Sequence, residues 1–231
     1  MYRILKNSSL VLLGAIATAS LLNACTTPRQ NQTQDSSPAA TTAASNKPMN
    51  HNSMDHGGMN HGMSMDLGPA DAEFDLRFVD AMIPHHEGAV TMAKEAQQKS
   101  QRPEIQKLAA DIIAAQNQEI ASLKQWRQAW YPKASVQPVA WNAQMGHAMP
   151  MSSDQRRSMA MDMDLGAADA EFDLRFINAM TPHHEGAVTM AKDALNKSQR
   201  PEIKQLAQDI IQSQEAEIQQ MQQWRKAWYQ Q

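Results

Sequence analysis

The sequence predicts an all-α protein, a four-helix bundle built from two duplicated αα-hairpins. The first observation is an internal repeat, because residues 66–131 and 164–229 align without gaps and about 47 of 66 positions are identical. The second is that each copy holds two segments with apolar residues at helical spacing. The third is composition. Aromatic residues make up only 5% of the chain, so its core must consist of aliphatic side chains and part of an unusual 17 Met.

The first helix of each copy is expected to begin near Gly68-Pro69 or Gly166-Ala167, with acidic residues in a first turn that the helix dipole favours. Pro84 and Pro182 fall inside this helix and are expected to bend it beside a pair of histidines. Its buried stripe in the first copy is predicted to contain Phe74, Phe78, Ala81, Met82, His85, Ala89, Met92 and Ala96.

The second helix of each copy is expected to start near Pro103 or Pro201. Two helices of roughly 28 residues form a hairpin about 40 Å long with one apolar face. Two such hairpins can cover each other, which predicts one bundle with pseudo-twofold symmetry, connected by the linker 132–163. The alternative architecture has each hairpin pairing with another chain.

The N-terminal segment 1–25 has the pattern of an export signal. Arg3 and Lys6 precede an apolar run, Leu10 to Leu22, that is short for a membrane span. The run ends in a sequence that resembles a bacterial lipobox, with Cys25 as the residue to be lipidated, and ordinary signal cleavage is the alternative. The chain is therefore expected in the periplasm or cell envelope, with a lipid anchor as its sole contact with the membrane.

Two segments are predicted to be disordered. Residues 26–65 are a polar tether ending in a Met/His-rich stretch, with too few large apolar side chains to offset the entropy of folding. The linker 132–163 is Met-rich and lacks a helical period. The formal net charge is −3 without runs of like sign, so nothing points to a nucleic-acid partner.

The tail and linker methionines are candidate metal ligands, because Met in a polar segment is not filling a core. Thioether sulfur selects Cu(I) and its mimic Ag(I), while imidazole also accepts Cu(II). The candidate ligands are Met49, His51, Met54, His56, Met59, His61, Met63 and Met65 in the tail, and Met145, His147, Met149, Met151, Met159, Met161 and Met163 in the linker.

A second candidate site is the motif Met-x-Pro-His-His-Glu-Gly-Ala-Val-x-Met in each first helix. Helical spacing places Met82, His85 and Met92 on the inward stripe, with His86 beside it and Glu87 outward. One histidine on an apolar face is more often a hydrogen-bonded core residue, but recurrence of the whole cluster favours a metal. The candidate bundle ligands are Met82, His85, His86, Met92, Met180, His183, His184 and Met190, with Gln116, Glu119, Gln214 and Glu217 as partners on the second helices.

The motif Phe-x-x-Ala-Met-x-Pro-His-His-x-Gly-Ala-Val-x-Met-Ala, followed by Pro-Glu-Ile, Leu-Ala and Ile-Ile, resembles the domain of unknown function family 305 (DUF305) in both copies. A tandem pair behind an export signal further resembles the CopM-type periplasmic copper-binding proteins of cyanobacteria. This resemblance implies a ferritin-like four-helix bundle that binds Cu(I) or Ag(I) and contributes to copper tolerance.

The function predicted is therefore an exported, non-catalytic protein that sequesters or carries Cu(I). Its partner would be a copper efflux system, a copper sensor or a copper enzyme. Two alternatives stay open: a copper-dependent oxidase on the same bundle, and an interaction module that binds no metal. A di-iron enzyme is disfavoured because the Glu-x-x-His motif of such bundles does not occur in the sequence.

Overall fold

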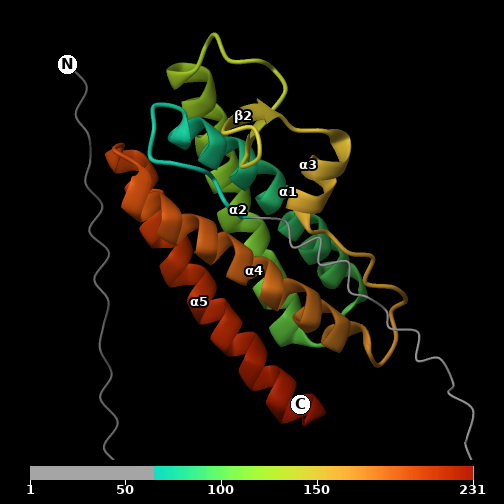
Figure 1. Cartoon of the computed structure of the whole chain (residues 1–231). Helices are drawn as coiled ribbons and strands as arrows, with labels where there is room; N and C mark the ends of the chain where they lie inside the picture. Colours follow the sequence, from blue (N-terminus) through green and yellow to red (C-terminus); the bar gives the residue numbers. More distant parts are fainter. Residues whose placement is uncertain (1–64, 231) are drawn as a thin grey trace, which may run out of the picture. The chain divides into compact units, whose positions relative to one another are not determined.

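The computed structural model describes residues 65–230, which contain five α-helices and one two-stranded sheet. The signal segment, Cys25, the tether and the tail ligands from Met49 to Met63 lie outside the described residues. The elements in chain order are α1 (Phe74–Lys99), α2 (Pro103–Trp130), β1 (Val139–Asn142), β2 (His147–Pro150), α3 (Ser153–Ala160), α4 (Phe172–Lys197) and α5 (Pro201–Tyr229) (Figure 1).

The predicted four-helix bundle of two hairpins is confirmed, with α1 packed on α2 and α4 packed on α5. Both second helices start at the predicted prolines. The first helices start later than expected, at Phe74 and Phe172. The reason lies in the preceding loops, where Gly68 and Gly166 have the left-handed φ angles of +80° and +75° that end a helical path.

The two hairpins meet through α1 and α4, which run antiparallel. One core cluster combines the first half of α1, the second half of α4 and the start of α5 around Phe78, Met190 and Ile210. The other combines the second half of α1, the first half of α4 and the start of α2 around Met92, Phe176 and Ile112. Each hairpin therefore contributes to both clusters, and the pseudo-twofold axis lies between the two clusters.

Cation–π pairs tie the two hairpins together at both ends of the bundle. The Arg200 guanidinium lies 4.1 Å from the ring centroid of Trp130, and the Arg102 guanidinium lies 4.2 Å from that of Trp228. Each arginine precedes the second helix of one hairpin, and each tryptophan ends the second helix of the other. The ends of the bundle are thus held by Arg–Trp contacts between the hairpins that were not predicted from the sequence.

The expectation of a disordered linker is wrong for residues 132–163. Gly146, with φ +69°, closes the turn between β1 and β2, and Ser152 and Gln155 form a capping box at the start of α3. The buried carboxylate of Asp80 accepts a hydrogen bond from the backbone of Val139 at 2.9 Å, which holds β1 against α1. The linker was expected to lack structure because its elements are too short to show a period.

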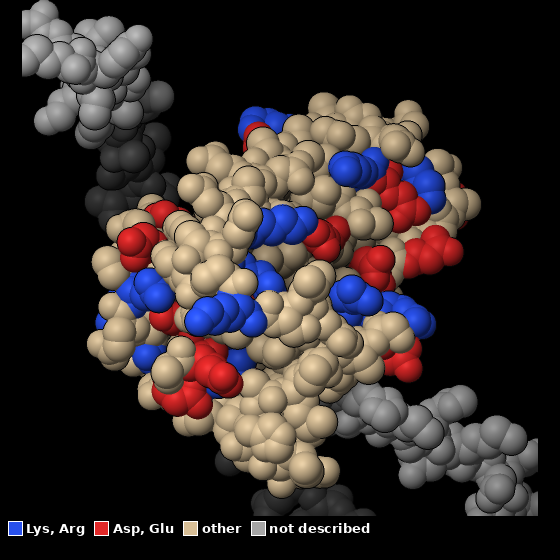
Figure 2. Space-filling view, turned by 90° about the horizontal axis from the view of Figure 1, so that it is seen from above, with Lys and Arg blue, Asp and Glu red and all other residues tan. Residues whose placement is uncertain are grey.

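Charges of both signs are interspersed over the face shown in Figure 2. Among residues 65–230, no helix combines the length and the apolar character needed to cross a membrane.

We predict that the double substitution Arg102→Ala/Arg200→Ala destabilises the bundle by about 1–3 kcal/mol, because two partly buried cation–π pairs and their ion pairs to Asp173 and Asp75 are lost. Urea unfolding followed by circular dichroism measures the change. The matched control is Lys107→Ala, which removes only an exposed pair with Asp111 within one helix. Equal destabilisation by the two variants would contradict the stabilising role of the Arg–Trp pairs.

Candidate metal centre

The four motif histidines lie together in the middle of the bundle, between the two core clusters. The side chains of His85, His86, His183 and His184 are all fully buried. The rings of His85 and His183 are in direct contact, with centroids 3.9 Å apart and planes at 55°. One histidine of each hairpin thus meets its counterpart at the pseudo-twofold axis.

The glycine of each motif allows another group to approach the helix closely. A Cβ at Gly88 would lie 1.8 Å from the backbone oxygen of Ala160, the last residue of α3. A Cβ at Gly186 would lie 3.0 Å from Nε2 of His85. The first glycine therefore admits the linker and the second admits the histidine of the opposite hairpin.

Two methionines approach the same glycine as His85. The methyl carbon of Met65 lies 3.2 Å and the sulfur of Met161 lies 3.7 Å from the Cβ position of Gly186. Met161 caps α3 with a φ of +47°, a left-handed conformation usually taken there by Gly or Asn. A strained backbone thus places a thioether beside His85.

Three of the four histidines have their Nε2 atom within 3.0 Å of an oxygen atom of the protein. Nε2 of His183 lies 3.0 Å from the Ala160 carbonyl, and Nε2 of His184 lies 2.6 Å from the Glu217 carboxylate. Nε2 of His86 lies 2.8 Å from Oε2 of Glu119, without hydrogen-bond alignment. Because a carbonyl and a carboxylate can only accept, the proton of His183 and His184 belongs on Nε2.

This arrangement leaves several ring nitrogens of the histidines without a hydrogen-bond partner. The Nδ1 atoms of all four histidines are buried without a hydrogen-bond partner, and so are the Nε2 atoms of His85 and His86. Buried nitrogens of this kind cost free energy unless a cation or donor occupies them. An imidazole anchored through one nitrogen with the other free is the usual arrangement of a metal-binding histidine.

Burial also lowers the basicity of the central pair. Desolvation, followed by repulsion from the other histidines, holds the pKa of His85 well below its ordinary value. Desolvation and the neighbouring His184 lower the pKa of His183 to about 3. Both rings are therefore neutral at physiological pH, the form that binds metals.

The structure separates motif methionines that sequence analysis grouped together. Met82 and Met92 are ten residues apart on one helix, which is about 15 Å along its axis, so they cannot share an ion. Met82 lies in the same core cluster as Met190, and Met92 lies with Met180. Because α1 and α4 run antiparallel, each of these inward methionines lies in a core cluster with a methionine of the opposite hairpin.

The linker methionines divide into three groups. Met145, Met149 and Met163 are exposed, as is His147. Met151 and Met159 are buried in the first core cluster and hold the linker in place. Met161, like Met65 at the end of the tail, lies at the histidines. Both were predicted as ligands in disordered segments, and no periodic signal in the sequence could have placed them at the centre.

Residues 65–230 contain no group of three or more His, Cys, Asp or Glu side chains arranged to hold a metal.

The fold and site define a class of protein: a duplicated helical bundle with a row of buried histidines and thioethers at its axis. The family model described as "Domain of unknown function (DUF305)" matches residues 21–127 and 75–225, and the chain belongs to this family.

Solved structures similar to this chain include copper- and silver-bound forms of CopM. The Cu(II)-bound form is 41% identical, covering 67% of this chain and 97% of that chain, with a TM-score of 0.54. A co-crystallised Ag-bound form is 40% identical with the same coverage and TM-score. A DUF305 fragment from Deinococcus radiodurans is 28% identical over 67% of this chain and 95% of that chain, with a TM-score of 0.52.

A curated relative, the uncharacterized protein L153 of Acanthamoeba polyphaga mimivirus, is 51% identical over 49 residues. The match covers 21% of this chain and 32% of the relative, so it spans about a third of that protein.

We predict that the metal-free protein loses stability as the pH falls below about 6.5. Below this pH the two rings, His85 and His183, become protonated in the unfolded chain but stay neutral in the folded protein. The free energy of unfolding therefore falls by up to about 1.4 kcal/mol per pH unit for each ring. The loss continues toward pH 3, where His183 itself titrates. Urea unfolding between pH 7.5 and 4.5 measures the slope.

The slope should be smaller in His85→Gln/His183→Gln, which removes both titrating rings, and unchanged in His147→Gln, whose ring is exposed. An identical slope in the double variant and the parent protein would show that the central pair does not cause the acid sensitivity.

Proposed function

We propose that this chain is a copper-binding protein that holds Cu(I), or Ag(I) in its place, at one centre shared by the two hairpins. The observation that carries the proposal is the contact of His85 with His183, where the unpartnered Nε2 of His85 meets Met65 and Met161 around Gly186. Imidazole together with thioether is a ligand set that suits Cu(I) and Ag(I).

Several features support holding an ion rather than transforming a substrate. The histidines are fully buried, and three of the four have Nε2 set against a fixed oxygen acceptor. The solved CopM structures, at about 40% identity, are described as Cu(I)-, Cu(II)- and Ag-bound forms, and none carries an enzymatic name. Cu(II) is therefore a further metal ion to test, and we expect Cu(I) to bind more tightly because the centre contains thioether sulfur.

The Met/His-rich tail and the exposed Met145, Met149, Met163 and His147 have the ligands to collect ions for this centre. Met65, the last tail residue, lies at Gly186 beside His85, so the tail leads directly to the histidines. The proposal includes export to the periplasm or cell envelope through the N-terminal signal, and a contribution to copper tolerance. A copper efflux system, sensor or copper enzyme would exchange ions with it.

The test is an Ag(I) and Cu(I) titration under reducing conditions on the full chain with seven of its eight tail ligands replaced, Met49, Met54, Met59 and Met63 by Leu and His51, His56 and His61 by Ala, while Met65 is kept. We refer to this protein as the tail-silent variant. One tightly bound ion per chain is expected.

In that background, His85→Ala or His183→Ala alone should abolish tight binding, because both imidazoles serve one ion. Met65→Leu/Met161→Leu should weaken it by roughly tenfold or more, since Leu keeps the volume and removes the sulfur. The matched control, Met151→Leu/Met159→Leu, changes two core methionines of the same region and should bind as the parent does. Undiminished binding in the histidine variants would refute the shared centre.

A further inference from the structure

The central histidines are part of a longer row that crosses the bundle. The row runs Glu119, His86, His85, His183, His184, Glu217. Its end contacts are 2.8 Å between Glu119 Oε2 and His86 Nε2, and 2.6 Å between His184 Nε2 and Glu217 Oε2. The ring centroids are 6.5 Å apart from His86 to His85, 3.9 Å at the centre and 6.3 Å from His183 to His184.

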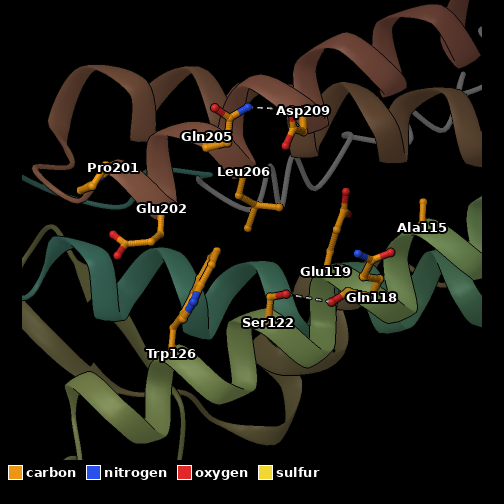
Figure 3. Close-up of a pocket in the computed structure, with 10 residues that line it drawn as sticks. All are labelled: Ala115, Gln118, Glu119, Ser122, Trp126, Pro201, Glu202, Gln205, Leu206 and Asp209. Atoms are coloured by element: carbon orange, nitrogen blue, oxygen red, sulfur yellow. Dashed lines mark hydrogen bonds between the residues drawn. The ribbon is translucent and has the colours of Figure 1, made fainter. Parts of the chain in front are cut away.

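Each end of the row opens into a groove between α2 and α5. The first groove, of about 700 Å³, is lined by Glu119 and Trp126 of α2 and by Leu206 and Asp209 of α5 (Figure 3). Figure 3 shows Glu119 projecting from α2 toward α5. The second groove, of about 450 Å³, is lined by the corresponding residues of the other copy, including Glu217 and Trp224.

Exposure changes abruptly along the row. The side chains of Glu119 and Glu217 are 15% and 20% exposed, whereas the four histidines are fully buried. The carboxylates are therefore the members of the row that a dissolved ion meets first.

The groove charges suit a cation. In the first groove, Glu119 is joined by Glu202 and Asp209, and its lining residues include no Lys or Arg. The second is lined by Glu104, Asp111 and Glu217 together with Lys107, which pairs with Asp111. Carboxylate oxygen attracts a soft cation but holds it weakly, and imidazole and thioether bind it better. Affinity thus increases from the groove toward the centre.

We propose that Glu119 and Glu217 are the uptake sites for Cu(I) or Ag(I), at the two mouths of one path that leads through His86 and His184 to the centre. This inference rests on the proposed function, because the path leads to the metal centre proposed at His85 and His183. The duplication has consequently produced one mouth in each copy, and both mouths lead to the same centre.

Stopped-flow mixing of Ag(I) with the tail-silent variant tests the proposal, with tryptophan emission as the signal because Trp126 and Trp224 line the two grooves. Glu119→Gln or Glu217→Gln alone should reduce the loading rate to about half, since one mouth remains. The double variant should load roughly tenfold more slowly or worse, because the attraction at both mouths is lost. Bound silver at saturation is measured in the same samples.

A steric variant closes the mouths without touching the carboxylates. Ser122→Trp/Gln220→Trp places bulk in both grooves and should also slow loading. The matched charge control is Glu87→Gln/Glu185→Gln, which changes two exposed glutamates of the same motif and should load at the parent rate. Circular dichroism verifies that each variant is folded.

The outcomes separate this inference from the proposed function. Full loading at the parent rate in both the Glu119→Gln/Glu217→Gln and the tryptophan variants would overturn the path and leave the centre intact. Complete loss of rate in one single variant would overturn the inference that both copies provide a working mouth. Absence of tight Ag(I) binding in the tail-silent variant itself would overturn the centre and the path together.

Discussion

The structure depends on the antiparallel contact between α1 and α4, at which His85 of one hairpin lies on His183 of the other. Gly186 permits this contact by leaving room for the His85 ring, and Gly88 leaves room for the end of α3. With α1 and α4 at the centre, the hydrophobic core is divided into two clusters on either side of the histidines. The second helices lie outside, and the grooves between them reach the ends of the histidine row.

Burying this row is costly for the metal-free protein. Six histidine nitrogens lack a hydrogen-bond partner, as do the Oε1 atoms of the buried Gln116 and Gln214. Each unsatisfied buried polar group costs on the order of 1–3 kcal/mol. The left-handed backbone of Met161 adds strain of a similar order. The bundle offsets these costs with its two core clusters and with the Arg–Trp pairs at its ends, and a bound cation would satisfy the free nitrogens.

Much of the architecture could be predicted from sequence because the signals are local and repeated. The two hairpins were predicted from the repeat, the helical spacing and the prolines Pro103 and Pro201. Membership of DUF305 is also confirmed. His85 was predicted on the inward stripe with His86 beside it, and both are buried, as are His183 and His184. Duplication helped, since a feature that appears twice in equivalent positions is hard to attribute to chance.

What sequence could not predict was the pairing between copies. Spacing along one helix groups Met82 with Met92, whereas packing places each near a methionine of the other hairpin. The roles of Met65 and Met161 depend on where a loop and a short helix end, and neither element has a period. The capping residues Ser152 and Gln155 and the turn at Gly146 were local signs of a folded linker, but the Met-rich composition favoured disorder.

The central claim is that the two hairpins share one ion at their axis, and anomalous scattering from crystals of the Ag(I)-loaded protein tests it most directly. Within the bundle, the account predicts one strong silver peak beside both His85 and His183, within reach of Met65 and Met161. Two separate peaks, one inside each hairpin with none at the contact of the two rings, would contradict it.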